Sequence, residues 1–305
     1  MQIVEAPDEF QRVIESMRLK DKSVGFVPTM GYLHDGHMAL VKRSRQENDI
    51  TAASIFVNPT QFNVSGDLTN YPRDLGRDLD LLENCGADFV FVPSVESIYE
   101  TDTQNSVVHR VNISVSNINS VFEGAHRPGH FDGVALIILK LFNLVGRCRA
   151  YFGLKDYQQV LLIIQLVKEL FIPVEVVRCQ TVRQSDGLAM SSRNARLNDH
   201  QLSLATVLYR SMFDALRLIE SGTVRIDALK ERITSQISKI EEINLEYVDV
   251  VTEGTLETPE FAEGPVRILI AAKLGDVRLI DNLGSEEIFG NEKAMQSAGV
   301  AGLKG

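Results

Sequence analysis

Strand-like and helix-like segments alternate over the first 180 residues, and this alternation limits the possible folds more than any other feature. Apolar or β-branched runs bounded by proline or glycine predict buried strands, and leucines recurring every three or four residues predict helices. Strands that alternate with helices favour a parallel sheet covered on both faces and joined by right-handed crossovers. We therefore expect an α/β, doubly wound parallel sheet with ligands at the carboxyl ends of its strands. The expected strands cover residues 23–27, 50–57, 88–92, 150–152 and 174–177, and the expected helices cover residues 37–48, 75–85, 133–145 and 156–170.

The pattern changes after about residue 180, where two amphipathic stretches are followed by three strand-like runs. Because 305 residues are many for a single core, the length favours two domains or one domain with a substantial appendage. The change of pattern leads us to expect two domains, residues 1–180 and a smaller α+β domain over residues 181–305. The polar tail beyond Gly284 is expected to be mobile. The expected helices of the second domain cover residues 199–220 and 226–240, and its expected strands cover residues 245–251, 266–272 and 277–281.

Charge and cysteine content exclude several classes of function. The chain has 31 basic and 41 acidic residues, and the net charge of −10 argues against a nucleic-acid-binding protein, which needs a basic face. Its three cysteines (Cys85, Cys148 and Cys179) are widely spaced, as is typical of buried thiols in a reducing compartment. No signal peptide is evident, and the apolar stretch at residues 134–145 is shorter than the roughly 20 residues that span a bilayer. We expect a cytoplasmic protein with no membrane partner.

The segment VGFVPTMGYLHDGHMALVKRS, residues 24–44, places two histidines in a glycine-containing turn between a strand and a helix. A helix N-terminus offers backbone N–H groups to an anion, and glycine lets a ligand approach closely. An isolated pair of this kind is more often a polar turn exposed to solvent, and a zinc site would need further ligands that are not nearby. The position between strand and helix favours a nucleotide phosphate site. A helix N-terminus also disfavours imidazolium, so His37 is expected to be mostly neutral.

Seven blocks between residues 28 and 282 resemble, in order, the signature blocks of the pantothenate synthetase (pantoate–β-alanine ligase) family. That family belongs to the HxGH nucleotidyltransferase superfamily, which includes the class I aminoacyl-tRNA synthetases. Each block alone is weak evidence, whereas seven in order make coincidence implausible. The blocks are PTMGYLHDGH, FVNPTQF, YPRD, RPGHFDGV, AYFGLKDYQQ, DGLAMSSRN and AAKLGDVRLIDN.

The resemblance implies a reaction and an assembly. Pantoate and ATP, with Mg²⁺, form pantoyl adenylate and pyrophosphate, and β-alanine then displaces AMP to give pantothenate. The resemblance also implies a cytoplasmic homodimer. Residues 1–180 would be a Rossmann-like domain that binds ATP and pantoate, and residues 181–305 a smaller lid domain with a flexible tail.

The resemblance further assigns residues to roles. Pantoate is assigned to the neutral amides of Gln61 and Gln159, which orient a carboxylate without withdrawing its electron density as an arginine would. His37 is the expected proton donor, and Lys155 a cation for the phosphates. The expected catalytic residues are His34, His37, Lys155, Ser191, Ser192 and Arg193. The expected nucleotide-binding residues are Met30, Gly31, Tyr32, Leu33, His34, Asp35, Gly36, His37, Gly153, Leu154, Lys155, Asp156, Val182, Met190, Ser191, Ser192 and Arg193.

Some positions stay open. Asp78 and Asp156 could approach the magnesium ion but are ordinarily helix-face or cap carboxylates, so the metal ligands are undetermined. Arg127 and His130 are expected to border the site. The family usually has glutamate at Leu154, a small residue at Tyr32 and glutamate at Asp35, and we expect an active enzyme despite these changes.

Two rival functions share the HxGH element or the nucleotide site. An adenylyltransferase would move AMP onto a phosphate acceptor, but would not be expected to carry FVNPTQF or AYFGLKDYQQ. A nucleotide-binding regulatory module would lack turnover. The two histidines, Lys155 and the MSSR run argue against that second alternative.

Overall fold

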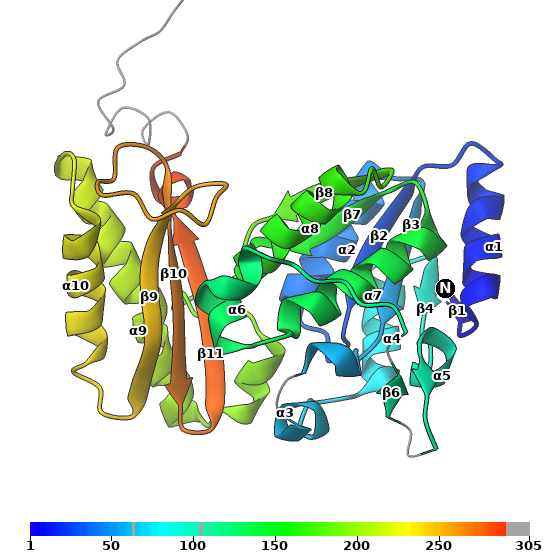
Figure 1. Ribbon diagram of the computed structural model, residues 1–305, viewed down its shortest axis with the longest axis horizontal. Coiled ribbons are helices and arrows are strands. Elements are labelled where there is room, and N and C mark those ends of the chain that lie inside the picture. The colour runs from blue at the N-terminus through cyan, green and yellow to red at the C-terminus, as the bar shows by residue number, and fades with distance from the viewer. Residues whose placement is uncertain (63–64, 104–105, 109, 291–305) are drawn as a thin grey trace, which may run out of the picture. The chain divides into compact units, whose positions relative to one another are not determined.

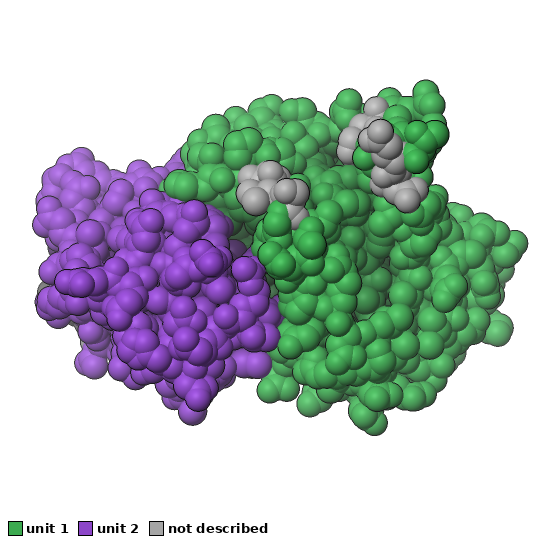
Figure 2. All heavy atoms as spheres, turned by 90° about the horizontal axis from the view of Figure 1, so that it is seen from below, with its two compact units in different colours: residues 1–180 green, residues 181–305 purple. Residues whose placement is uncertain are grey.

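The computed structural model describes residues 1–62, 65–103, 106–108 and 110–290, and it divides into two compact units. Residues 1–180 form the first unit and residues 181–305 the second, and Figure 2 colours them green and purple. The expected mobile tail lies partly in residues 291–305, which are outside the described residues. None of the helices in the described part of the chain is long and apolar enough to cross a membrane.

A six-stranded sheet forms the centre of the described part of the first unit, in the order β1-β4-β3-β2-β7-β8. Every neighbouring pair of these strands is parallel, and helices follow the strands along the chain (Figure 1). The expected doubly wound α/β class is therefore confirmed. The strands of this sheet are β1 (Gln2–Val4), β2 (Val24–Thr29), β3 (Ile50–Ile55), β4 (Phe89–Phe91), β7 (Cys148–Gly153) and β8 (Val174–Cys179).

The remaining elements of the first unit include helices and a two-stranded sheet of β5 and β6. They are α1 (Pro7–Arg18), α2 (Asp35–Glu47), η1 (Pro59–Gln61), α3 (Ser65–Thr69), α4 (Leu75–Asn84), α5 (Val95–Ile98), β5 (Glu100–Thr101), β6 (Val107–Val108), η2 (Ile118–Ser120), α6 (Phe122–His126), α7 (His130–Val145), η3 (Leu154–Asp156) and α8 (Tyr157–Glu169).

Alternate residues of the strands bury against helices on opposite faces of the sheet. Val90 of β4 belongs to a core cluster with Val41 of α2 and Leu82 of α4. The next residue, Phe91, points to the other face and stacks on Phe10 of α1 with ring centroids 4.6 Å apart. Both faces of the sheet are therefore covered, which explains why its inner strands β2 and β3 are buried along almost their full length.

The order of the strands reverses between β2 and β7, which are neighbours in the sheet. From β2 the chain crosses through α2 to β3 on one side, and from β7 it crosses through α8 to β8 on the other. In a doubly wound sheet a crevice opens at this reversal, beyond the carboxyl ends of the strands. The loop after Thr29 and the turn after Gly153 both begin there.

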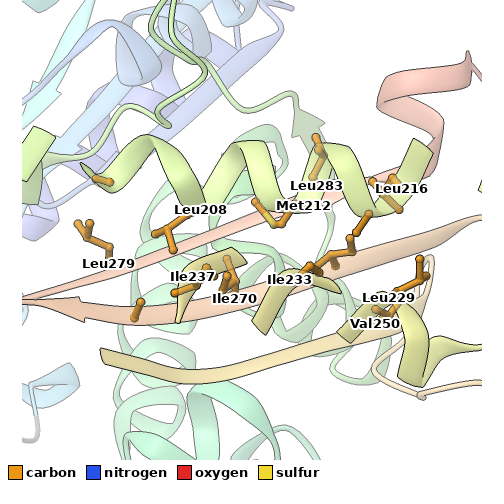
Figure 3. Packing of buried hydrophobic residues seen from close by; sticks show 14 of the residues in the cluster. Leu208, Met212, Leu216, Leu229, Ile233, Ile237, Val250, Ile270, Leu279 and Leu283 are labelled. Carbon is orange, nitrogen blue, oxygen red and sulfur yellow. The ribbon is translucent and has the colours of Figure 1, made fainter. Parts of the chain in front are cut away.

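The second unit packs two helices on a three-stranded antiparallel sheet with the order β11-β10-β9. Figure 3 shows its core, where Met212 of α9 and Ile233 of α10 meet Ile270 of β10. Both helices and all three strands were expected, and each observed strand is longer than expected. The elements are η4 (Ser192–Arg196), α9 (Asp199–Leu216), η5 (Arg217–Ser221), α10 (Ile226–Ile237), β9 (Ile243–Thr252), β10 (Val266–Leu274) and β11 (Val277–Gly284).

The expectation of a mobile tail directly after Gly284 is wrong for residues 285–290, which are helical. Glu286 and Glu287 of this segment bind the guanidinium of Arg267, whose side chain is fully buried in β10. Glu253 completes the cluster, with 2.7 Å between its carboxylate and Nε of Arg267. These ion pairs fix the segment, because a buried guanidinium without its carboxylates costs several kcal/mol, about 3–5.

Candidate active site

The two histidines of the HxGH element cap the helix that they begin. His34 is the N-cap of α2, and its Nδ1 accepts a hydrogen bond from the N–H of Gly36 at 3.1 Å. His37 reaches back, and its Nδ1 accepts from the N–H of His34 at 3.3 Å. A neutral imidazole that accepts at one nitrogen carries its proton on the other. Each ring therefore holds its proton on Nε2, where it can be donated to an anion.

Both imidazoles are held in the neutral form. Burial, followed by the positive charge of Lys155, lowers the pKa of His34 to about 4. Burial, followed by the neighbouring His34 and then by Lys155, lowers the pKa of His37 well below its usual range. The ring centroids of the two histidines lie 4.1 Å apart. The expected neutrality of His37 is confirmed, and burial contributes to it more than any other cause.

The loop between β2 and α2 is fixed by Asp78 of α4, a carboxylate with 1% of its surface exposed. Its oxygens accept hydrogen bonds from the N–H groups of Tyr32 at 2.6 Å and Leu33 at 2.7 Å. Burial raises the pKa of Asp78. Gly31 and Tyr32 both have positive φ, of 81° and 49°, and a Cβ on Gly31 would lie 3.0 Å from the Asp78 carboxylate. Asp78 thus organises the loop, a role that the sequence did not reveal.

These contacts correct one part of the sequence argument. The N–H groups of the loop were expected to be available to an anion. Instead, Gly31 donates to the hydroxyl of Thr29, Tyr32 and Leu33 donate to Asp78, and His34 and Gly36 donate to the histidine rings. These five N–H groups are therefore engaged within the protein.

Lys155 lies on the turn η3 that follows β7, and its positive charge helps to lower the pKa of both histidines. Its Nζ is 3.9 Å from the carboxylate of Asp156, and its side chain is mostly buried. Gly153 ends β7 just before this turn. Leu154, where the family usually has glutamate, is buried with 6% of its surface exposed. The carboxyl ends of β2 and β7 thus bring His34, His37 and Lys155 to one place.

The two glutamines expected to bind pantoate lie in the first unit, on η1 and α8. Gln61 is buried, its Oε1 accepts from Asn58 at 3.2 Å, and its Nε2 donates to the sulfur of Met30. Gln159 is half-buried in the first turn of α8. Its neighbour Gln158 is buried and accepts from the N–H of Glu123 at 3.0 Å. The amide group of Gln158 also donates to two backbone carbonyls of residues 118–121, so Gln158 is structural, and binding of pantoate by Gln159 stays a prediction.

A cleft of about 810 Å³ opens in the first unit beside the same loop. Met30, Gly31 and Tyr32 line it, together with Thr60 of η1, the last residue of β3 and the two residues that follow that strand. Its lining is mainly apolar. The ring of Tyr32, one of the lining residues, is contacted by the guanidinium of Arg77, which lies 5.6 Å from the ring centre. The cleft provides space for a small ligand at the carboxyl edge of the sheet.

The other expected nucleotide-binding residues belong to the second unit. Val182 and Met190 pair through the N–H of Met190 and the carbonyl of Val182, at 2.9 Å. Ser191 caps η4 and accepts from the N–H of Arg193 at 3.3 Å. Ser192 is buried. Val182 and Met190 thus close a short hairpin, and Ser191, Ser192 and Arg193 follow it directly. The approach of these residues to the nucleotide stays a prediction.

In the described part of the chain, no group of three or more histidine, cysteine or acidic residues is arranged to hold a metal ion. Asp78 is occupied by two backbone N–H groups, and Asp156 is exposed beside Lys155. These side chains do not form a metal cage.

Comparison with known proteins gives one consistent result. Residues 2–284 match the pantoate-beta-alanine ligase family. The pantothenate synthetase of Caldicellulosiruptor bescii is 46% identical over 283 residues, which are 93% of this chain and 98% of that protein. The crystal structure of pantothenate synthetase from Thermus thermophilus is 40% identical, with a TM-score of 0.86 over 93% of this chain and 99% of that one. The pantoate-beta-alanine ligase of Francisella tularensis, complexed with beta-gamma ATP and beta-alanine, is 36% identical, with a TM-score of 0.76 over 94% and 98% of the two chains.

Proposed function

The chain belongs to the pantoate-beta-alanine ligase family, and from that premise we propose that the β2–α2 loop is where it activates pantoate with ATP. It is an ATP-dependent ligase that condenses pantoate with β-alanine to pantothenate, releasing AMP and pyrophosphate through a pantoyl-adenylate intermediate. What remains to be assigned is the part that each residue takes.

In the first step an oxygen of the pantoate carboxylate forms a bond to the α-phosphorus, and the bond from that phosphorus to pyrophosphate breaks. Negative charge grows on oxygens that are already anionic. The Nε2–H groups of His34 and His37 and the ammonium of Lys155 are the donors that we assign to these oxygens. Preorganised donors directed at developing charge usually contribute the largest single part of catalysis.

Neutral histidines suit this step because they donate without acquiring a proton from solvent first. His37 donates a hydrogen bond through its Nε2–H, since its Nδ1 is engaged by the backbone of His34, and it acts as the proposed proton donor only after the ring has been protonated. Binding of a triphosphate should raise the low pKa of His37, because anionic oxygens favour imidazolium.

We assign pantoate to Gln61 and Gln159. Both carry uncharged amides, which can orient a carboxylate and bind hydroxyls while leaving the carboxylate nucleophilic. In the second step the neutral amine of β-alanine attacks the acyl carbon, a C–N bond forms, the acyl–oxygen bond breaks with its electron pair leaving on AMP, and the nitrogen releases one proton to solvent. The first unit is thus the proposed ATP- and pantoate-binding domain.

The second unit is the proposed lid, and its Val182, Met190, Ser191, Ser192 and Arg193 are proposed to contact the nucleotide. Two hydroxyls and a guanidinium on one short turn offer donors suited to phosphate oxygens. Mg²⁺ is proposed to arrive on the triphosphate and to neutralise part of its charge. We further propose that the enzyme is a homodimer and acts in the cytoplasm, where its substrate ATP is made and its three free cysteines stay reduced.

The observation that carries the assignment is the pair of Nε2-protonated histidines beside Lys155 at the reversal of strand order. The test is the complete reaction with ATP, pantoate and β-alanine, each omitted in turn. Pyrophosphate should be released with ATP and pantoate alone, and AMP and pantothenate should require all three. Transfer of AMP to a phosphate acceptor, or ATP binding without any turnover, would overturn the proposal.

A further inference from the structure

The backbone carbonyl of Gln61 is held by two side chains from a distant part of the chain. Nδ1 of His130, in the first turn of α7, lies 2.8 Å from this oxygen, and Nη2 of Arg127 lies 3.4 Å from it. A carbonyl only accepts, so Nδ1 of His130 carries the proton. Nε2 of the neutral ring then accepts from Nη1 of Arg127, at 3.1 Å. The carbonyl of Gln61, the imidazole of His130 and the guanidinium of Arg127 thus form a triangle in which each group contacts the other two.

The imidazole of His130 works in this triangle only while it is neutral. Its side chain is buried, with 6% of its surface exposed. Burial, followed by the charge of Arg127, lowers the pKa of His130 to about 3. A protonated ring would place an N–H against the guanidinium. His130 is therefore a fixed donor to Gln61 and takes no part in moving protons near neutral pH.

The close approach of α7 to η1 supports the same contact. The carbonyl of Gly133, in the first turn of α7, accepts from Nδ2 of Asn58 at 3.2 Å. A Cβ at Gly133 would lie 2.3 Å from the carbonyl oxygen of Thr60, so only glycine allows this packing. The turn that carries Gln61 thus rests directly on the start of α7.

The triangle also reaches the second glutamine. Glu123 of α6 lies 3.8 Å from Nη1 of Arg127, and the N–H of Glu123 donates to the amide oxygen of Gln158. Gln158 directly precedes Gln159 in α8. One network of buried and partly buried polar groups therefore connects the segments that carry Gln61 and Gln159.

We propose that Arg127 and His130 are positioning residues that set the place of Gln61, and with it the binding of the acid substrate. The proposal rests on the proposed function, in which Gln61 binds pantoate. Neither residue needs to touch the substrate. Their effect should appear in the KM for pantoate and leave the KM for ATP nearly unchanged.

The test compares three replacements of His130 with one control. Asparagine places an amide N–H near the position of Nδ1 and can still donate to Gln61, whereas glutamine reaches the position of Nε2, and leucine replaces both nitrogens by carbon. The control is His126→Leu, because Nδ1 of the exposed His126 lies 2.8 Å from the carbonyl of Phe122, away from Gln61. All four variants are assayed in the complete reaction, with thermal unfolding measured alongside.

His130→Leu should raise the KM for pantoate about tenfold, the effect expected from losing one buried hydrogen bond, and change the KM for ATP less than about twofold. His130→Asn should recover most of this loss and His130→Gln less. A parallel rise of both constants, or equal effects of Asn and Leu, would overturn the proposal. If His130→Leu does not fold, Arg127→Lys decides, because lysine keeps the charge beside Glu123 but loses the forked donor. That variant should raise the KM for pantoate about threefold, and an unchanged value would refute the proposal.

Failure of the proposed function is distinguishable from failure of this inference. The former would show as a wild-type enzyme that makes no pantothenate, or as a Gln61→Ala variant with an unaltered KM for pantoate. The positioning role would then be decided by amide hydrogen exchange of residues 58–62. Faster exchange in His130→Leu or Arg127→Lys than in His126→Leu supports it, and equal exchange overturns it.

Discussion

The carboxylate of Asp78 lies 2.6 Å from the backbone nitrogen of Tyr32, 46 positions away in the sequence. This contact holds a non-glycine residue at a φ of 49°, a conformation that costs about 1 kcal/mol when nothing supports it. Asp78 therefore acts on the loop between β2 and α2 as a structural anchor. Its two oxygens are already occupied by N–H groups, which explains why it is a poor candidate for a metal ligand.

Replacing Asp78 by asparagine should loosen this loop. The amide NH₂ would face an N–H donor, so one buried donor loses its acceptor and the free energy of unfolding should fall by about 1–3 kcal/mol. The KM for ATP should rise as well. The matched control is Asp74→Asn, because Asp74 caps the same helix and asparagine caps equally well. Equal stability of the two variants in urea unfolding would contradict the anchoring role.

His37→Gln should separate the structural and chemical roles of this histidine. Glutamine at the third position of a helix can accept the N–H of the N-cap residue, so the reciprocal cap survives. The Nε2–H donor is lost, and kcat should fall at least about a hundredfold, the usual effect of removing such a donor. His37→Leu should lose activity and stability together. Pyrophosphate release and thermal unfolding measure the two effects, and a glutamine variant with wild-type kcat would refute the assignment.

Stability should fall as the solution is acidified below the usual histidine pKa. The pKa of His130 is about 3 in the folded chain and near 6.5 in the unfolded chain, so the unfolded chain binds more protons between these values. Its contribution is fully present above about pH 6.5 and is lost at up to about 1.4 kcal/mol per pH unit as the pH falls. His34, with a pKa of about 4, acts in the same direction.

The contribution of His130 is isolated by comparison with His130→Asn. Asp78 and Glu286, whose pKa values are raised by burial, act in the opposite sense but are present in both proteins. Urea unfolding at several pH values between about 5 and 7.5 should show the steeper dependence in the wild type. Parallel curves would mean that His130 is protonated in the folded chain.

Alanine variants of the adjacent residues Gln158 and Gln159 should separate a structural role from a substrate-binding role. Gln158→Ala removes three hydrogen bonds to buried backbone groups and should lower the free energy of unfolding by at least about 2 kcal/mol. Gln159→Ala should change stability by less than about 1 kcal/mol and instead raise the KM for pantoate. The reverse result would show that the roles of the two residues have been exchanged.

Much of the fold could be predicted because each strand and helix is indicated by the pattern of neighbouring residues in the sequence. The run 24–27 is apolar over its full length, the run 50–55 begins and ends with isoleucine and holds only small residues between, and the helices show regular spacing. The short strand β1 and helix α1 were missed, since β1 has one buried residue and α1 buries only Phe10 and Ile14. The polar tail was judged by composition, which does not show that Glu286 and Glu287 meet Arg267.

The candidate site could be predicted only in part, because most of its contacts join residues far apart in the chain. The histidine pair and the glycine before it are visible in one short motif. By contrast, Asp78 and Tyr32 are 46 positions apart, and His130 and Gln61 are 69 apart. No local pattern indicates such pairs. The sequence also cannot show which of two adjacent glutamines is structural. The orientation of α8 against residues 118–123 decides that the amide of Gln158, rather than that of Gln159, makes the hydrogen bonds to the backbone there.

The ion pairs of Arg267 also determine at which residue this polypeptide can be truncated without loss of stability. Gly284, the last residue of the final strand, looks like a natural end point for a shortened version. Truncation there would delete two of the three carboxylates that neutralise Arg267 and leave Glu253 as its one charged companion in the cluster. The second unit would be destabilised at Arg267, which lies inside its sheet and is distant in sequence from the truncation. A shortened polypeptide should therefore retain Glu286 and Glu287.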